Sequence, residues 1–250
     1  MVCPTVRAGA AACLATALLL TGCGGSSGSS SGSASSGGGA AASKAASQVQ
    51  GLPADQVLAK AKQALASARS VHFAAKGASG SSDGDISFDM HLTAGPNATG
   101  TIGAAGQEVK LVRIGKDAYF SGNEKVLAGL SGGKATAGKW VKLPASNSDL
   151  SGLLDITDLS NGMGSVLKAK GKLSLGTPKV VDGKQTVALV DSDPSGGGTL
   201  YVSAEGTPYP LLIEPSAASK DKATATFTEY DAPVTVTPPP AADVVEAPAG

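Results

Sequence analysis

The stretch that decides the fold is Asp85-Ile86-Ser87-Phe88-Asp89-Met90-His91-Leu92-Thr93, in which polar and apolar residues alternate without interruption. In an extended chain, successive side chains point to opposite faces, so all four apolar residues share one face. This period of two predicts a β-strand with one face in a core and one face in water. The sheet that contains it therefore needs a cover for its apolar face.

Similar runs of apolar and β-branched residues follow along the chain, separated by turn residues. Two short turns are explicit: Gly115-Lys116-Asp117, and Asp182-Gly183, which is a strong signal for a two-residue hairpin. Antiparallel hairpin connections are therefore expected throughout. The further predicted strands are 71–76, 98–102, 107–114, 118–121, 139–143, 179–181, 185–190, 199–203, 210–213 and 223–229.

Two helical segments interrupt the strands. A helix is predicted from Pro53, a favoured first-turn residue, because Ala54, Val57, Leu58, Ala61, Leu65 and Ala68 fall on one arc of about 120°. From Asp149 to about Lys170, leucines recur at helical spacing but are interrupted by Asn161-Gly162, which predicts two short helices. The fold class is α+β: a large antiparallel sheet that curls, with a leading helix and a short helical insertion covering its apolar face.

The N-terminus carries Leu20-Thr21-Gly22-Cys23, which matches the lipobox of bacterial lipoproteins. Ahead of it stand Arg7 and an apolar run, 8–20, that is shorter than the roughly 20 residues a spanning helix needs. We expect cleavage before Cys23, a diacylglyceryl group on its thiol, and a chain anchored on the outer face of the bacterial plasma membrane. The alternative is an ordinary secretory signal that contains a cysteine.

Four regions are expected along the chain. Residues 1–22 form the lipoprotein signal peptide, and residues 23–50 form the lipidated cysteine and a Gly/Ser/Ala tether with an r.m.s. span of about 28 Å. Residues 51–236 form the folded domain, and residues 237–250 form a partly ordered tail rich in Pro and Ala.

Composition excludes several classes of function. Removing residues 1–22 leaves 19 basic and 20 acidic residues, and a near-neutral chain without a basic cluster argues against binding to nucleic acid. The three cysteines are Cys3, Cys13 and Cys23, so the mature domain has no thiol for a disulfide, a metal or a nucleophile.

Motifs for catalysis are also missing from the sequence. Gly133 to Trp140 has the spacing of a phosphate-binding loop, but Trp140 stands where a magnesium-binding Ser or Thr is needed. Asp85 and Asp89, with Asp83 nearby, are interpreted as a solvated strand face rather than a cation site. The two histidines, His72 and His91, are interpreted as polar-face or sheet-end residues. We expect no enzyme activity, no cofactor and no metal.

The chain has, in order, a lipobox, a Gly/Ser/Ala tether, an amphipathic helix, a curled antiparallel sheet, a helical insertion and closing strands. In this order it resembles the actinobacterial LprG/LppX-type (LppX_LprAFG) lipoproteins, which are similar in fold to the LolA-like half-barrels. The resemblance covers most of residues 51–245 and rests on the order of several short stretches. They are Val181-Asp182-Gly183-Lys184-Gln185-Thr186-Val187, Gly198-Thr199-Leu200-Tyr201-Val202, Thr207-Pro208-Tyr209-Pro210-Leu211, and Phe227-Thr228-Glu229-Tyr230-Asp231-Ala232-Pro233-Val234 followed by Pro238-Pro239-Pro240. The resemblance implies an unclosed half-barrel whose helix-roofed concave face holds acylated lipids or glycolipids and carries them across the envelope.

Short helices that cover a large apolar sheet face can leave an unfilled apolar cavity between helices and sheet, and such a cavity suits acyl chains. The expected lining combines the apolar set of the 85–93 strand with the helical insertion: Ile86, Phe88, Met90, Leu92, Leu150, Leu153, Leu154, Leu159, Met163, Val166 and Leu167. Secondary candidates are Val109, Leu111, Val187, Leu189, Leu200 and Val202.

The chain is therefore expected to be a membrane-anchored, monomeric envelope lipoprotein that binds an acylated lipid, a glycolipid or another apolar ligand. Transport of that ligand is the further role that the resemblance implies. The alternative is an envelope lipoprotein whose core is fully packed and which binds a protein partner such as a transporter or a sensor.

Overall fold

The computed structural model describes residues 47–78, 85–104, 106–133, 138–144, 151–219 and 222–247. All of them belong to one compact unit, Ser43–Gly250. The predicted signal peptide, Cys23, most of the predicted tether and Leu150 lie outside the described residues. Among the described helices, none is long and apolar enough to cross a membrane.

The described residues form an α+β fold, which confirms the predicted fold class. The helical elements are α1 (Ala54–Ser67), α2 (Glu124–Ser131), α3 (Ser151–Ile156), η2 (Met163–Leu167) and η3 (Ala241–Asp243). The strands are β1 (Ser70–Ala78), β2 (Asp85–Thr93), β3 (Asn97–Ala104), β4 (Gln107–Ile114), β5 (Asp117–Ser121), β6 (Trp140–Pro144), β7 (Leu173–Leu175), β8 (Val180–Val181), β9 (Lys184–Asp191), β10 (Gly198–Ser203), β11 (Pro210–Pro215), β12 (Thr224–Thr228) and β13 (Val244–Glu246).

One large sheet has the strand order β13-β6-β5-β4-β3-β2-β1-β12-β11-β10-β9-β7. The first half of the chain builds outward from β1 to β6, and the second half returns from β7 to β12, which pairs with β1. The β1–β12 ladder is therefore the seam between the two halves of the chain. The sheet is unclosed. Neighbouring strands within it are antiparallel except for β13 and β6, which are parallel.

The alternating stretch from Asp85 to Thr93 forms β2 with the predicted bounds. Met90 and Leu92 are buried on one face, and Asp85 and Asp89 are exposed on the other. The alternation therefore specifies the orientation of this strand, because a shift of one residue would bury the carboxylates. Asp182 and Gly183 both have positive φ, as the predicted hairpin between β8 and β9 requires.

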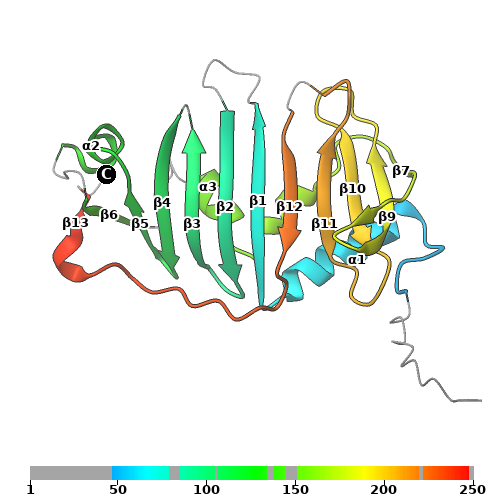
Figure 1. The fold of residues 1–250 in the computed structure, drawn as a ribbon, viewed down its shortest axis with the longest axis horizontal. Helices are drawn as coiled ribbons and strands as arrows, with labels where there is room; N and C mark the ends of the chain where they lie inside the picture. The colour runs from blue at the N-terminus through cyan, green and yellow to red at the C-terminus, as the bar shows by residue number, and fades with distance from the viewer. Residues whose placement is uncertain are drawn as a thin grey trace, which may run out of the picture. The chain divides into compact units, whose positions relative to one another are not determined.

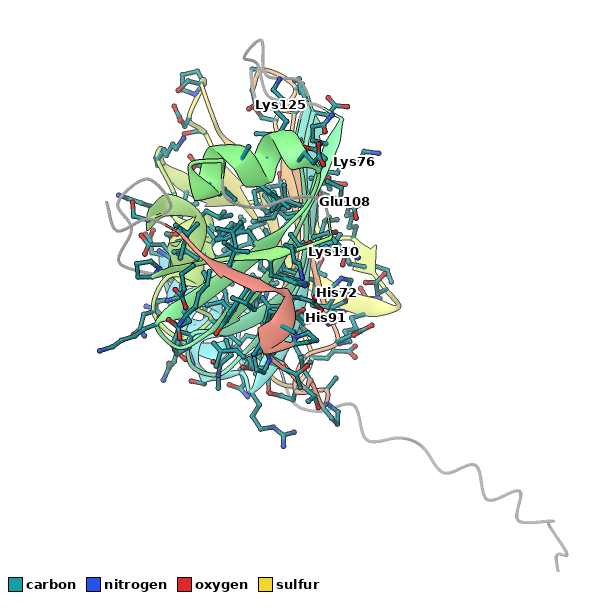
Figure 2. The ribbon with its side chains drawn as sticks, turned by 90° about the vertical axis from the view of Figure 1, so that its left-hand side faces the viewer. His72, Lys76, His91, Glu108, Lys110 and Lys125 are labelled. Carbon is teal, nitrogen blue, oxygen red and sulfur yellow. The ribbon has the colours of Figure 1, made fainter. Side chains whose placement is uncertain are left out.

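The helices α1, α3 and η2 lie on one side of the sheet (Figures 1 and 2). Val57, Ala61 and Leu65 of α1 are fully buried, as the apolar arc predicted. The insertion forms two short helical elements, α3 and η2, with Asn161-Gly162 between them, which confirms that prediction.

Four elements, α2, β7, η3 and β13, were not predicted from the sequence. The helix α2 begins after Asn123, whose side chain accepts a hydrogen bond from the Val126 N–H at 3.0 Å, and ends at Gly132 with φ 61°. The strands β7 and β13 have only three residues each and exist because they pair with β9 and β6. Within the segment assigned to a Pro/Ala-rich tail, the chain runs along one end of the sheet to reach β13 (Figure 1).

Candidate functional site

A pocket of about 200 Å³ lies between the helical elements and the β11–β7 end of the sheet. Leu200 is in register with Leu189 on one neighbouring strand and with Ile213 on the other, so these three side chains form one row across the sheet. Helical and edge-strand residues complete the apolar lining. The apolar side chains of the pocket are Leu58, Val166, Leu167, Leu173, Leu189, Leu200 and Ile213.

Asp191, at the end of β9, organises the polar side of the pocket. Its carboxylate accepts the backbone N–H groups of Lys170 at 2.8 Å, Gly171 at 2.8 Å and Asp193 at 3.0 Å. Burial raises the pKa of Asp191, but the three donors outweigh this effect, so its pKa lies below the ordinary value. The ionised carboxylate therefore fixes the segment that leads from η2 into β7.

Glu214 borders the pocket through its backbone, but it follows Ile213 on β11, so its side chain lies on the opposite face of the sheet. It accepts a hydrogen bond from Lys179 Nζ at 2.7 Å, and this bond is the largest cause that lowers the pKa of Glu214. The same ammonium group lies 4.3 Å from the centroid of the Tyr201 ring. Asp191 is therefore the carboxylate on the pocket side, and Glu214 pairs with Lys179 on the other side of the same strands.

The predicted lining residues are distributed between this pocket and the core. Val166 and Leu167 line the pocket, and Leu167 also belongs to the main core cluster, in which Met90, Leu92, Leu154, Leu159 and Met163 are buried. Phe88 and Leu153 are partly buried against that cluster, and Ile86 is partly exposed at the far end of β2. Leu150 lies outside the described residues. The structure brings most of the predicted lining together in one packed cluster.

The secondary candidates divide in the same way. Leu189 and Leu200 line the pocket, Leu111 and Val109 contact the main core, and Val187 and Val202 belong to a second cluster under α1. Leu58, Leu173 and Ile213 line the pocket but were not predicted as lining residues. Leu58 carried a usable signal, because it lies on the apolar arc of α1 next to fully buried positions.

Several solved structures are similar to this architecture. LprF from Mycobacterium bovis matches with a TM-score of 0.52 over 74% of this chain and 96% of that chain, at 16% sequence identity. The fold is that of LprF. Lipoprotein LppX from Mycobacterium tuberculosis matches with a TM-score of 0.49, covering 73% of this chain and 99% of that chain at 18% identity. A LolA-superfamily protein from Nitrosomonas europaea matches at 11% identity, with a TM-score of 0.28 and coverage of 76% and 96%. No family model and no curated protein sequence matches the chain.

In this chain the centre of the LprF fold is filled by its own side chains. Gly100 on β3 lies opposite Met90 on β2, and a Cβ at position 100 would be 2.8 Å from Met90 Sδ. The Met90 side chain therefore packs into the space that the glycine leaves free. This packing explains why the pocket lies at the β7 end rather than under β2.

Arg113 joins the helical insertion to the sheet. Its Nη1 donates to the carbonyl oxygen of Leu154 and, at 2.8 Å, to Thr157 Oγ1. Arg113 lies opposite the buried Ala98 in register, so its position is on the core face of β4. Burial lowers the pKa of the guanidinium, and Asp158 and Asp155 oppose that shift. We call this contact the Arg113 latch, because it is a charged anchor for α3.

Proposed function

We propose that this chain is a lipoprotein of the bacterial cell envelope that binds an acyl chain or another apolar ligand in the pocket beside η2. The observation that carries the proposal is the row of Leu189, Leu200 and Ile213 across three neighbouring strands, which lines the pocket. Apolar lining with a few placed polar groups is typical of sites for small apolar ligands.

The size of the pocket limits the ligand. Ligand pockets usually have volumes of about 300–1,000 Å³, and this one is smaller, at about 200 Å³. It fits part of one acyl chain. We propose that a lipid with several chains separates α3 and η2 from the sheet and reaches the predicted lining around Met90, Leu159 and Met163. The expectation that the chain is not an enzyme agrees with this use of the fold.

The pocket is tested by a matched pair of substitutions on β7. Leu173 lines the pocket, whereas Leu175, two residues further on, is 54% exposed and lies outside it. Native mass spectrometry of the full chain, purified from its membranes, is expected to show acyl species bound to the unaltered protein and to Leu175→Trp. Leu173→Trp is expected to lose most of them, because an indole fills the lining.

Other results would overturn the pocket proposal. A chain that is consistently free of acyl species, or one in which Leu173→Trp and Leu175→Trp carry the same amount, would exclude ligand binding at this site. Either result would favour the alternative function, an envelope lipoprotein with a packed core and a protein partner.

The anchor is proposed at Cys23, within the lipobox-like Leu20-Thr21-Gly22-Cys23. Cys23→Ala is expected to move the protein from the membrane fraction to the soluble fraction, since acyl chains supply about 0.8 kcal/mol of membrane affinity per buried CH₂. Cys13→Ala, in the apolar run of the predicted signal, is the matched control and is expected to remain in membranes. Immunoblots of the two fractions decide the result. A Cys23→Ala protein that stays in the membrane fraction would contradict the anchor.

A further inference from the structure

The two histidines of the chain are brought together on the polar face of the sheet. His72 on β1 is in register with His91 on β2, and their ring centroids are 4.4 Å apart with an interplanar angle of 15°. Figure 2 shows the two labelled residues next to one another at the sheet. Because the chain contains no other histidine, the fold places its entire imidazole content at one point.

A carboxylate from a third element completes the cluster. Glu229 follows β12, which pairs with β1 so that Thr228 is opposite His72. Its Oε2 is 3.8 Å from His91 Nδ1, and one ligand atom each from His72, His91 and Glu229 lie within 4.8 Å of one another. Two imidazoles and one carboxylate are the donor set of many zinc sites.

The backbone around Glu229 is fixed from both sides. Glu229 itself has φ 51°, an uncommon conformation for a residue with a side chain. Two residues later, the Asp231 carboxylate accepts the Arg69 N–H at 2.8 Å and the Tyr209 hydroxyl at 2.7 Å, and the Asp231 N–H bonds to the Ser70 carbonyl at 3.0 Å. These bonds tie the segment after β12 to the start of β1, so the Glu229 carboxylate is held beside the histidines.

A second carboxylate orients one imidazole. His72 Nε2 is 2.9 Å from Asp89 Oδ1, and His72 Nδ1 is 3.2 Å from Thr228 Oγ1. An ionised carboxylate only accepts hydrogen bonds, so Nε2 of a neutral His72 carries the proton and Nδ1 keeps its lone pair. A histidine that donates one ring N–H to a carboxylate while the other nitrogen binds metal is a recurrent arrangement around zinc.

We propose that His72, His91 and Glu229 bind one divalent transition-metal ion of the Zn²⁺ class. Tetrahedral zinc, with ligand bonds of about 2.0–2.1 Å, needs ligand atoms about 3.3 Å apart. The three side chains therefore move together when the ion binds, and the two imidazole rings turn out of their stacked arrangement, because a ring nitrogen binds a metal in the plane of its ring. They are free to do so because their side chains are 22%, 36% and 57% exposed. Asp89 is the positioning residue, and a water molecule completes the coordination.

A metal ion at this position would stabilise the folded state. Its ligands come from β1, β2 and the residue after β12, so a bound ion spans the β1–β12 seam between the two halves of the chain. An ion that binds only the folded state stabilises it by mass action. The site is on the polar face, away from the pocket, so this inference is independent of the proposed ligand.

The test uses the untagged full chain, purified in detergent, stripped of metal with a chelator and titrated with ZnCl₂ in a calorimeter. We expect one equivalent of Zn²⁺ per chain, a rise in Tm, and shifts in the imidazole NMR signals of both histidines. His72→Gln and His91→Gln are each expected to weaken binding by at least about 100-fold, since loss of a mere orienting partner already costs about 10–100-fold. Glu108→Gln, at an exposed carboxylate on β4, is the matched control and leaves binding unchanged.

A second variant separates loss of the ligand from loss of the fold. Glu229→Gly removes the carboxylate but suits the positive φ, so we expect weaker Zn²⁺ binding with an undiminished Tm in the metal-free state. Absence of binding to the unaltered chain would overturn the proposal. So would binding that survives in His72→Gln and His91→Gln, or a stoichiometry of several ions with no change at the imidazoles.

Discussion

Replacing Phe227 with alanine is expected to lower the free energy of unfolding by about 3–5 kcal/mol, a large part of the roughly 5–15 kcal/mol that stabilises a typical domain. Phe227 is fully buried, and its ring centroid is 5.2 Å from that of Phe73. The two residues are in register on β12 and β1. The substitution therefore opens a cavity at the seam where the two halves of the chain meet.

Denaturant unfolding followed by circular dichroism measures the effect. Thr224→Ala is the matched control, because Thr224 lies on the same strand but is exposed, and a change within about 0.5 kcal/mol is expected. A loss of less than about 1 kcal/mol for Phe227→Ala would show that the two halves are not held together by this contact.

The second large effect is expected for Arg113→Ala, which removes the latch between β4 and α3. Two charge-assisted hydrogen bonds are lost, to the Leu154 carbonyl and to Thr157 Oγ1, and each bond of this kind contributes about 1.5–3 kcal/mol. The helical insertion would then open more often. A local destabilisation of about 1.4 kcal/mol already raises the open population tenfold.

Hydrogen exchange by mass spectrometry reports that opening directly. Peptides that cover 151–167 are expected to exchange at least about tenfold faster in Arg113→Ala, while β2 and β3 keep their protection. Lys110→Ala, at an exposed position on the same strand, is the control. Unchanged exchange in 151–167 would show that apolar packing alone holds the insertion in place.

The strongest sequence predictions concerned elements whose pattern and environment agree. The period of two in 85–93 gave the bounds of β2, and the apolar arc placed α1 to within a residue or two, because both elements have one wet face and one buried face. Elements that depend on strand pairing or on a helix cap, and have no long sequence pattern, were not predicted. The strands β7 and β13 are too short to show a period, and α2 depends on the Asn123 cap and Gly132 rather than on a long apolar stripe.

The candidate pocket was predicted less well than the fold. Its apolar lining comes from six elements, from α1 to β11, and no periodicity relates residues on different elements. Alternation also does not state which side chains leave space and which fill it. Met90 was expected to line a cavity and is instead packed over Gly100, an outcome that depends on the neighbouring strand.

By itself, the sequence determined the α+β class, the two faces of the sheet, the covering helices and the residues that carry polar chemistry, because each of these follows from local periodicity and composition. Only the tertiary structure decided the location of the pocket, the Arg113 latch and the meeting of His72, His91 and Glu229. Glu229 is 138 positions beyond His91 in the numbering, and the two meet because β12 returns to pair with β1. Strand order is set by which apolar surfaces can be buried together, and that is a property of the whole chain.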